Sequence, residues 1–447
     1  MHYQYLLLTT YYLLFTLLAW RRLNWAVLLI IAALPSYLIR FQVGPIPMTL
    51  LEGMILVVFA VWLIRHKSIK ALKHENKKLL TPIGLFFIAA TIGMFVSPDL
   101  RAAAGIWKAY FVEPILFFLV LRDLITLPSP PLNLRGGRGG VTTNQIIRAL
   151  SITALLLSLY AIYQRFTGFG IPPPWDKELR VTSIFLYPNA LGLFLAPLVP
   201  LFVAATFRSP LWRSKDRRYI LHTMYYLLVT LSSMTAIIFA KSTGALVGIG
   251  TGLLFMGGSY FFLESKRKLV QPLGLPCLQA GSTFYILILT GIILSLLTIP
   301  KIKNELLLRD WSGHVRKTQW SETWTMLKDT STPLGAGRPI IGAGLSGYKT
   351  ALAPYHKATY LEIFEYPHNI VLNFWSETGL LGLLVFLWII ILFFRNTRHH
   401  AAIASMVVIL IHGLVDVPYF KNDLAILFWI IYALGLLSTK TPTTTSS

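Results

Sequence analysis

The sequence predicts an all-α fold: a polytopic integral membrane protein of about 12–13 transmembrane helices with one large external loop that contains an amphipathic helix. The first observation is composition, because 55% of the 447 residues are hydrophobic and only 13% are charged, too few to cover a soluble domain of this size. The second is that apolar runs long enough to cross a bilayer recur along the chain, separated by short charged loops.

Thirteen apolar runs are candidate spans. They lie near residues 4–20, 25–39, 45–64, 81–97, 106–121, 146–164, 188–207, 220–240, 244–263, 282–299, 369–394, 401–415 and 423–438. The first run lacks a basic start and a small-residue cleavage site, so we expect a span and not a removed signal peptide. We expect N-terminal helices over residues 1–180, a second membrane domain over 181–440 that includes the loop 301–366, and a polar tail over 441–447.

The net charge of +22 reflects membrane topology and not nucleic-acid binding, because Lys and Arg concentrate in short loops between the apolar runs. The basic loop 65–80 is therefore expected in the cytoplasm, as is the Pro/Gly/Arg-rich flexible insertion 126–145. Alternation of the spans then places the loop 301–366 outside. The single cysteine, Cys277, excludes an internal disulfide and a thiolate metal cluster.

The external loop 301–366 contains a predicted helix and a glycine-rich segment. Val315, Trp320, Trp324 and Leu327 recur at helical spacing, so residues 314–327 are expected to form an amphipathic helix on the membrane surface. Five glycines follow, at positions 335, 337, 342, 344 and 347, which permit tight turns and close approach to a ligand. The segment lacks the Lys-Ser/Thr ending of a phosphate-binding P-loop, so nucleotide binding is not predicted.

The window PHNIVLNFWSETGLLGLL (367–384) places a histidine and a glutamate at the mouth of a span. On a continuous helix, Glu377 points away from His368 and lies about 13 Å deeper along the axis. The two side chains are therefore not expected to share a reacting atom. Glu377 is interpreted as a supporting, buried hydrogen-bond acceptor, and His368 on its own would be read as an interfacial histidine.

This window resembles the signature of the O-antigen ligase and polymerase family: a His-Asn start, a Leu four residues further on, then Glu-x-Gly and a second Gly. The resemblance extends to Arg180, an external arginine ahead of a Pro-Asn pair that opens a helix. It also includes Arg316, which precedes a Trp and the Pro/Gly segment that contains Arg338. It covers the half from about 180 to 436 well and the first five spans weakly.

The resemblance implies an enzyme that transfers a glycan from an undecaprenyl-pyrophosphate carrier to an acceptor, on the outer face of the cytoplasmic membrane of a bacterium. It makes His368 the catalytic base that accepts the proton of the acceptor hydroxyl. The arginines expected to bind the donor pyrophosphate are Arg180, Arg316 and Arg338, and the supporting residues are Asn189, Asn369, Glu377 and Asp416. No cofactor and no metal are expected, because arginines neutralise the leaving group.

Several alternatives stay open. A transporter or flippase of lipid-linked saccharides would use the same basic groups, and a membrane scaffold would bind no ligand. Within the enzyme class, the acceptor can be a glycan chain, a lipid core or a protein, as in a protein O-oligosaccharyltransferase. The sequence lacks Asp-x-Asp, WWDxG, HExxH and GxSxG, which disfavours metal-dependent nucleotide-sugar transferases, oligosaccharyltransferase catalytic subunits, zinc proteases and serine hydrolases.

Overall fold

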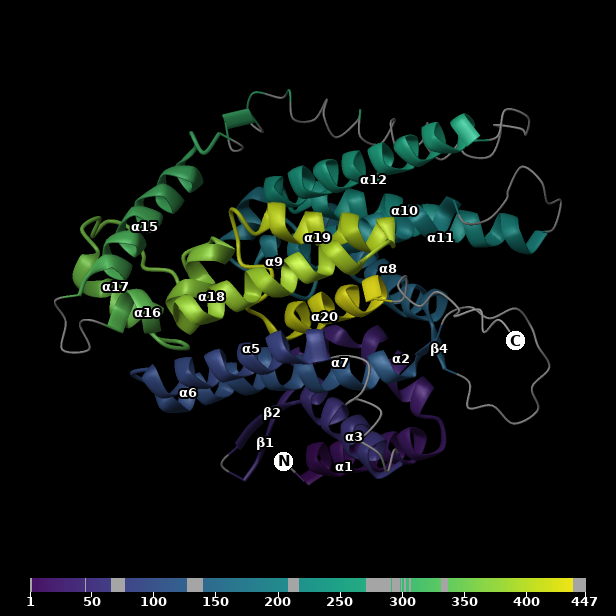
Figure 1. The fold of residues 1–447 in the computed structure, drawn as a ribbon, viewed down its shortest axis with the longest axis horizontal. Helices are drawn as coiled ribbons and strands as arrows, with labels where there is room; N and C mark the ends of the chain where they lie inside the picture. The colour runs from purple at the N-terminus through teal and green to yellow at the C-terminus, as the bar shows by residue number, and fades with distance from the viewer. Residues whose placement is uncertain are drawn as a thin grey trace. The chain divides into compact units, whose positions relative to one another are not determined.

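The computed structural model describes residues 2–44, 46–65, 77–126, 140–207, 217–270, 307–330 and 337–436, together with residues 291, 298, 300, 303 and 304 (Figure 1). The chain forms two compact units, each made of segments that are separated in the sequence. Unit 1 comprises Met1–Ala149, Thr318–Asn396 and Tyr419–Ser447, and unit 2 comprises Leu150–Lys317 and Thr397–Pro418.

Unit 1 is built mainly of helices. They are α1 (His2–Arg21), α2 (Leu23–Ala32), α3 (Leu50–Arg65), α5 (Lys77–Val96), α6 (Leu100–Ile106), α7 (Glu113–Leu124), α16 (Arg338–Ile341), α17 (Tyr348–Leu352), α18 (Ile370–Asn396) and α20 (Asn422–Leu436). A π-helical stretch, Trp107–Val112, joins α6 to α7. Helix α15 (Trp311–Lys328) contributes residues 318–328 to this unit.

The segment between α2 and α3 in unit 1 contains a β-hairpin, at the position where the hydrophobic runs predict the ends of two spans. Helix α2 stops at Ala32, and a short 3-10 helix (Leu34–Leu38) with Pro35 near its start follows. Strands β1 (Arg40–Val43) and β2 (Ile46–Thr49) then pair antiparallel, and Gly44 between them has a φ of +60°. Proline lacks the N–H that continues a helix, so α2 ends before Pro35 and is shorter than the apolar run 25–39 in which it lies.

An aromatic cluster holds together α5, α18 and the segment that precedes α20 in unit 1. The rings of Phe374 and Phe386, which lie on opposite sides of the break in α18 at Gly379, stack with centroids 4.0 Å apart. Phe86 on α5 lies 5.8 Å from Phe374, and Tyr419 lies 5.3 Å from it. All four rings are buried, and offset aromatic pairs of this kind stabilise a core beyond the area that they bury.

Unit 2 consists of most of α8 (Thr143–Thr167) and the helices that follow it. They are α9 (Pro188–Leu195), α10 (Val199–Phe207), α11 (Arg217–Phe239), α12 (Thr243–Val270), residues 311–317 of α15, and α19 (His400–His412). Small residues bring α12 against α19, because a Cβ on Gly252 would lie 2.8 Å from the carbonyl oxygen of Ala404 and one on Gly248 would lie 3.1 Å from that of Val408. Close approach of backbones through glycine is typical of membrane helices.

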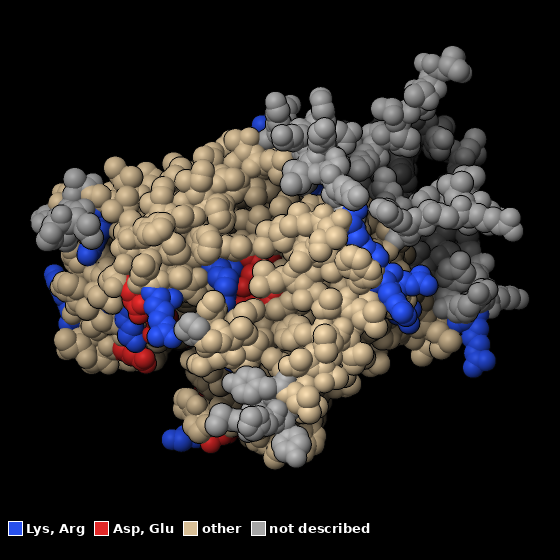
Figure 2. All heavy atoms as spheres, turned by 90° about the horizontal axis from the view of Figure 1, so that it is seen from below, with Lys and Arg blue, Asp and Glu red and all other residues tan. Residues whose placement is uncertain are grey.

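Six helices of the described residues are long and apolar enough to cross a membrane: Leu79–Val96, Leu100–Leu124, Thr143–Thr167, Pro188–Phe207, Ile220–Phe239 and Ile370–Asn396. Five shorter apolar helices accompany them: Leu6–Arg21, Leu23–Ala32, Thr243–Ser259, His400–His412 and Asn422–Leu436. Most of the predicted run 282–299 lies outside the described residues. On the face that Figure 2 shows, most of the described surface carries neither Lys/Arg nor Asp/Glu, as contact with lipid requires. The predicted class, an all-α polytopic membrane protein, is confirmed.

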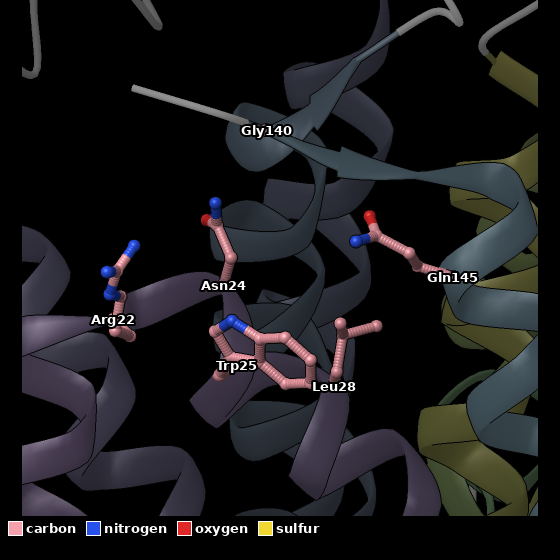
Figure 3. A pocket seen from close by; sticks show the side chains of 6 residues that line it. All are labelled: Arg22, Asn24, Trp25, Leu28, Gly140 and Gln145. Carbon is pink, nitrogen blue, oxygen red and sulfur yellow. The ribbon is translucent and has the colours of Figure 1, made fainter. Parts of the chain in front are cut away.

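A small cavity of about 210 Å³ lies in unit 1, near the starts of α2 and α8 (Figure 3). Its lining residues are Arg22, Asn24, Trp25, Leu28, Gly140 and Gln145. The cavity lies beside the described ends of the insertion 126–145, where β3 (Ile125–Thr126) pairs in parallel with β4 (Val141–Thr142). It contains none of the residues that the sequence predicts for a glycosyltransferase site.

Candidate active site

Unit 2 brings together three of the predicted site residues. Pro188 occupies the first turn of α9, where its fixed φ suits a helix start and its missing N–H costs nothing. Asn189 follows, and its amide nitrogen donates to Oδ2 of Asp416 over 3.2 Å. Nη2 of Arg180 lies 3.5 Å from the amide oxygen of the same asparagine. Asn189 therefore links an arginine and a carboxylate that are more than 200 positions apart in the sequence.

The guanidinium of Arg180 is further fixed by a carbonyl and by an aromatic ring. Its Nε donates to the carbonyl oxygen of Ala240 over 3.2 Å, and its Cζ lies 4.9 Å from the ring centroid of Trp175. A cation over an indole face is attracted by the quadrupole of the ring. Sequence reasoning missed Trp175, although an aromatic residue five positions before Arg180 was a visible signal.

Arg316, on α15, contacts the segment of unit 2 that contains Asp416. Its Nε donates to the carbonyl oxygen of Val415 over 3.0 Å, and its Nη1 bonds the hydroxyl of Ser312. Val415 directly precedes Asp416, so Arg316 and the chain from Arg180 both converge on the turn after α19. These residues carry two guanidinium groups, those of Arg180 and Arg316, and one buried carboxylate, that of Asp416. Their combined charge is therefore positive, which suits them to binding a phosphate ligand.

His368 lies in unit 1, immediately before α18, and has a φ of +48°. Asn369 caps the helix, because its side-chain oxygen accepts the N–H groups of Val371 and Leu372 over 3.0 and 3.1 Å. The expectation that His368 belongs to a continuous helix is therefore wrong. Its direction relative to Glu377 cannot be read from a helical wheel, because the backbone at residue 368 is left-handed.

Two neighbours position the His368 segment in unit 1. The indole N–H of Trp320 on α15 donates to the carbonyl oxygen of Pro367 over 2.7 Å, which ties the backbone before the histidine to that helix. The ring of Phe364 meets the imidazole nearly at right angles, with centroids 4.9 Å apart. The histidine as a whole is half-buried.

Glu377 binds the glycine-rich segment inside unit 1. Its buried side chain accepts the N–H of Ser346 through Oε2 over 2.7 Å. Two residues later α18 is interrupted at Gly379, which has a φ of +70°, and the N–H of Ala343 donates to the carbonyl oxygen of Ser376 over 2.7 Å. A Cβ at Gly342 would lie 2.5 Å from the same oxygen. These glycines therefore let the segment approach the backbone of α18 closely.

Arg338 also lies in unit 1, whereas Arg180 and Arg316 lie in unit 2. Its Nη1 contacts the hydroxyl of Tyr355 over 3.2 Å and the carbonyl oxygen of Ala351 over 3.5 Å. The hydroxyl of Tyr355 in turn donates to Oδ2 of Asp329 over 2.5 Å. Arg338 therefore helps to hold the segment between α15 and α18 in its fold.

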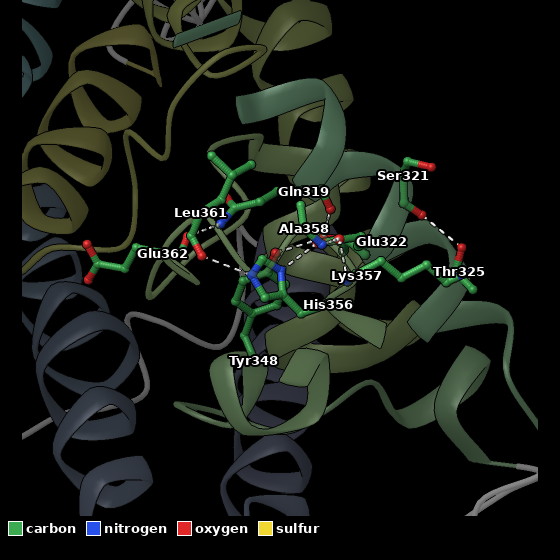
Figure 4. Close-up of polar contacts among 11 residues, drawn as sticks. Gln319, Ser321, Glu322, Thr325, Tyr348, His356, Lys357, Ala358, Leu361 and Glu362 are labelled. Atoms are coloured by element: carbon green, nitrogen blue, oxygen red, sulfur yellow. Dashed lines mark hydrogen bonds and ion pairs between the residues drawn. The ribbon is translucent and has the colours of Figure 1, made fainter. Parts of the chain in front are cut away.

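Sequence reasoning missed a second polar group in this loop, centred on Glu322 of α15 (Figure 4). Its Oε2 lies 2.9 Å from Nδ1 of His356, and its Oε1 accepts the N–H of Lys357 over 3.0 Å. Nε2 of the same histidine lies 2.9 Å from the carbonyl oxygen of Leu361. The hydrogen bond to Glu322 raises the pKa of His356 above its usual value, against the opposing effect of burial. No local sequence signal joins residues 34 positions apart.

The fold and these contacts define the class of the protein as a multi-pass membrane protein whose glycine-rich segment packs on the membrane helix α18. The model of the O-antigen ligase family matches residues 227–387, which include Arg316, Arg338, His368, Asn369 and Glu377. Residues 227–387 are therefore an O-antigen ligase domain, and the members of this family are enzymes that use lipid-linked glycans. No curated protein matches the chain. Within the described ranges, no group of three or more His, Cys, Asp or Glu side chains could hold a metal ion.

Proposed function

We propose that the protein transfers a glycan from an undecaprenyl-pyrophosphate carrier to an acceptor hydroxyl, on the outer face of the cytoplasmic membrane of a bacterium and without a metal. The O-antigen ligase domain supports the reaction class. The observation that carries the proposal is the group in unit 2 in which Arg180, Asn189 and Asp416 form one hydrogen-bonded chain and Arg316 binds the adjacent carbonyl of Val415.

In this proposal the arginines of unit 2 bind the pyrophosphate of the donor. A guanidinium offers a planar fork of N–H donors that matches two phosphate oxygens, and it stays charged at every relevant pH. The single carboxylate, Asp416, orients Asn189 and does not cancel both positive charges. Arg338 is assigned to donor binding as well, and its guanidinium also contacts the hydroxyl of Tyr355.

The chemical step begins when His368 accepts the proton of the acceptor hydroxyl, and the oxygen attacks the anomeric carbon. A new glycosidic C–O bond forms as the bond from the anomeric carbon to the pyrophosphate oxygen breaks, and the electron pair leaves with undecaprenyl pyrophosphate. The arginines stabilise the charge that develops on this leaving group, so no cation is needed. One direct displacement inverts the anomeric configuration.

The decisive experiment reconstitutes the purified full-length protein with lipid-linked glycan and three acceptor classes: a glycan chain, a lipid core and a polypeptide. The acceptor that gains sugar identifies the activity. Movement of lipid-linked glycan across the bilayer without any transfer would instead support a flippase and overturn the proposal. Absence of both would indicate a scaffold.

Variants separate the proposed roles of the histidine and the arginines. His368→Ala should lower single-turnover transfer by about 10²- to 10⁴-fold and leave donor affinity nearly intact, as expected for loss of a general base. Arg180→Ala and Arg316→Ala should weaken donor binding, by about 1.5–3 kcal/mol each. Lys317→Ala is the matched control, because this neighbour of Arg316 is exposed. An arginine variant that binds donor normally would refute the role of that residue.

A further inference from the structure

The cavity near the starts of α2 and α8 is lined by hydrogen-bond donors. Arg22 supplies a guanidinium, Trp25 an indole N–H and Gln145 an amide NH₂ group, and the six lining residues include no carboxylate. In Figure 3 the indole nitrogen of Trp25 and the amide nitrogen of Gln145 both face the space between α2 and α8. A cavity with this lining suits an anion.

The orientation of Gln145 follows from its own hydrogen bonds. Its side-chain oxygen accepts the backbone N–H of Thr142 over 2.9 Å and the hydroxyl of the same residue over 3.0 Å. Both bonds go to the side-chain oxygen of Gln145, so its NH₂ group is directed toward the cavity (Figure 3). They also tie the residue to β4, whose pairing with β3 fixes the backbone on that side.

The surroundings of the cavity are those of a membrane interface. The cavity lies where the apolar helices α1 and α2 meet in a turn containing Arg22. The side chains of Trp25 and Leu29 on α2 are 61% and 39% exposed, so an apolar surface runs from the rim of the cavity along the helix. Interfacial tryptophan and arginine beside exposed aliphatic side chains form the usual boundary between lipid headgroups and acyl chains.

We propose that this cavity binds the phosphate headgroup of an anionic phospholipid from the surrounding bilayer. The volume of about 210 Å³ is below the range of about 300–1,000 Å³ typical of whole small-molecule sites, so it admits a headgroup and leaves the acyl chains on α2. Basic pockets between membrane helices are a known form of headgroup recognition. The inward bias of Lys and Arg assigns this end of α2 to the cytoplasmic leaflet.

This site is independent of the proposed glycan transfer. Its residues precede the O-antigen ligase domain, and none of them belongs to the groups around Arg180 or His368. A lipid bound there fills a donor-rich space whose six described lining residues include no carboxylate, and it joins the turn between α1 and α2 to the start of α8.

The test measures lipid retention by the full-length protein in detergent with native mass spectrometry. The probes are dioctanoyl phosphatidylglycerol, dioctanoyl phosphatidylcholine and inorganic phosphate. We expect one phosphatidylglycerol to bind, and Arg22→Ala to weaken its binding about tenfold, because one hydrogen bond to a charged group is lost. Arg21→Ala is the matched control: this arginine is adjacent and exposed but does not line the cavity. If Arg22→Ala fails to fold, Gln145→Leu tests the opposite wall and should give a smaller loss.

Three results would overturn the proposal. Equal losses in Arg21→Ala and Arg22→Ala would mean that general surface charge attracts the lipid. Equal binding of phosphatidylcholine would show that the cavity does not select an anionic headgroup. Inorganic phosphate that displaces phosphatidylglycerol at equal concentration would identify a soluble anion, and not a lipid, as the ligand.

Discussion

The contact between Glu322 and His356 should make the loop between α15 and α18 more stable at low pH than at high pH. The perturbation is a double-mutant cycle of Glu322→Gln, His356→Gln and the double variant. Each single change removes one charge and keeps a side chain of similar size that can still form hydrogen bonds. The cycle therefore isolates the interaction between the two residues from the packing of either one.

The expected magnitude follows from the geometry. The Nδ1 to Oε2 distance is 2.9 Å and both side chains are only 9% exposed, so the bond is charge-assisted and poorly screened by solvent. A bond of this kind contributes about 1.5–3 kcal/mol. Because the folded loop raises the pKa of His356, its contribution is complete below the unfolded value of about 6.5 and declines as pH rises through the higher folded pKa.

Hydrogen–deuterium exchange at the amides of Lys357 and Ala358 measures the effect directly, since both N–H groups donate to Oε1 of Glu322. All four proteins are compared at the same pH, at about pH 5 and about pH 9, so the intrinsic exchange rate cancels. The exposed ion pair Lys349–Glu365 provides the control cycle, with a coupling below about 1 kcal/mol. A coupling for Glu322 and His356 that is as small as the control, or that grows toward high pH, would refute the reasoning.

Three further outcomes are expected. Gly379→Ala should lower the free energy of unfolding by more than about 2 kcal/mol, because φ is +70° and a Cβ would lie 2.9 Å from the carbonyl carbon of Ile341. The control is Gly84→Ala on α5, where a Cβ would meet nothing within 4 Å. This variant should leave thermal stability unchanged or raise it. Transfer activity should survive excess EDTA, and a loss restored by magnesium would contradict leaving-group stabilisation by arginine alone. In a cysteine-free background, Ser321→Cys should react with an impermeant thiol reagent on intact cells, and Asn144→Cys should not. The reverse labelling pattern would show that the predicted topology is inverted.

The positions of the helices along the chain were largely predictable, because the hydropathy of a span is a property of contiguous residues. Each of the predicted spans within the described ranges contains a helix, and the predicted amphipathic segment is helix α15. The glycine-rich segment also followed from local chemistry, since Gly342 and Gly344 have φ values of +74° and +83°. Such features depend on neighbours in the sequence, which a single sequence displays.

The side-chain partners were not predictable in the same way. The left-handed backbone at His368 interrupts the helical periodicity that a wheel assumes, and the cap by Asn369 is visible only once the helix start is known. The contact of Glu377 with the N–H of Ser346 joins positions 31 residues apart, two residues before the glycine that breaks α18. Periodicity carries no information on which distant backbone group a buried carboxylate will meet.

The parallel pairing of β3 with β4 has a practical consequence for handling the protein. Because Ile125 pairs with Val141 and Thr126 with Thr142, the two ends of the intervening stretch are already fixed side by side by the folded chain. The closure entropy of a loop grows only with the logarithm of its length, and each doubling costs about 0.6 kcal/mol. A fluorescent protein or a rigid fiducial domain for imaging could therefore be spliced between these strands, with its own adjacent termini matched to theirs, at little expense to the surrounding helices.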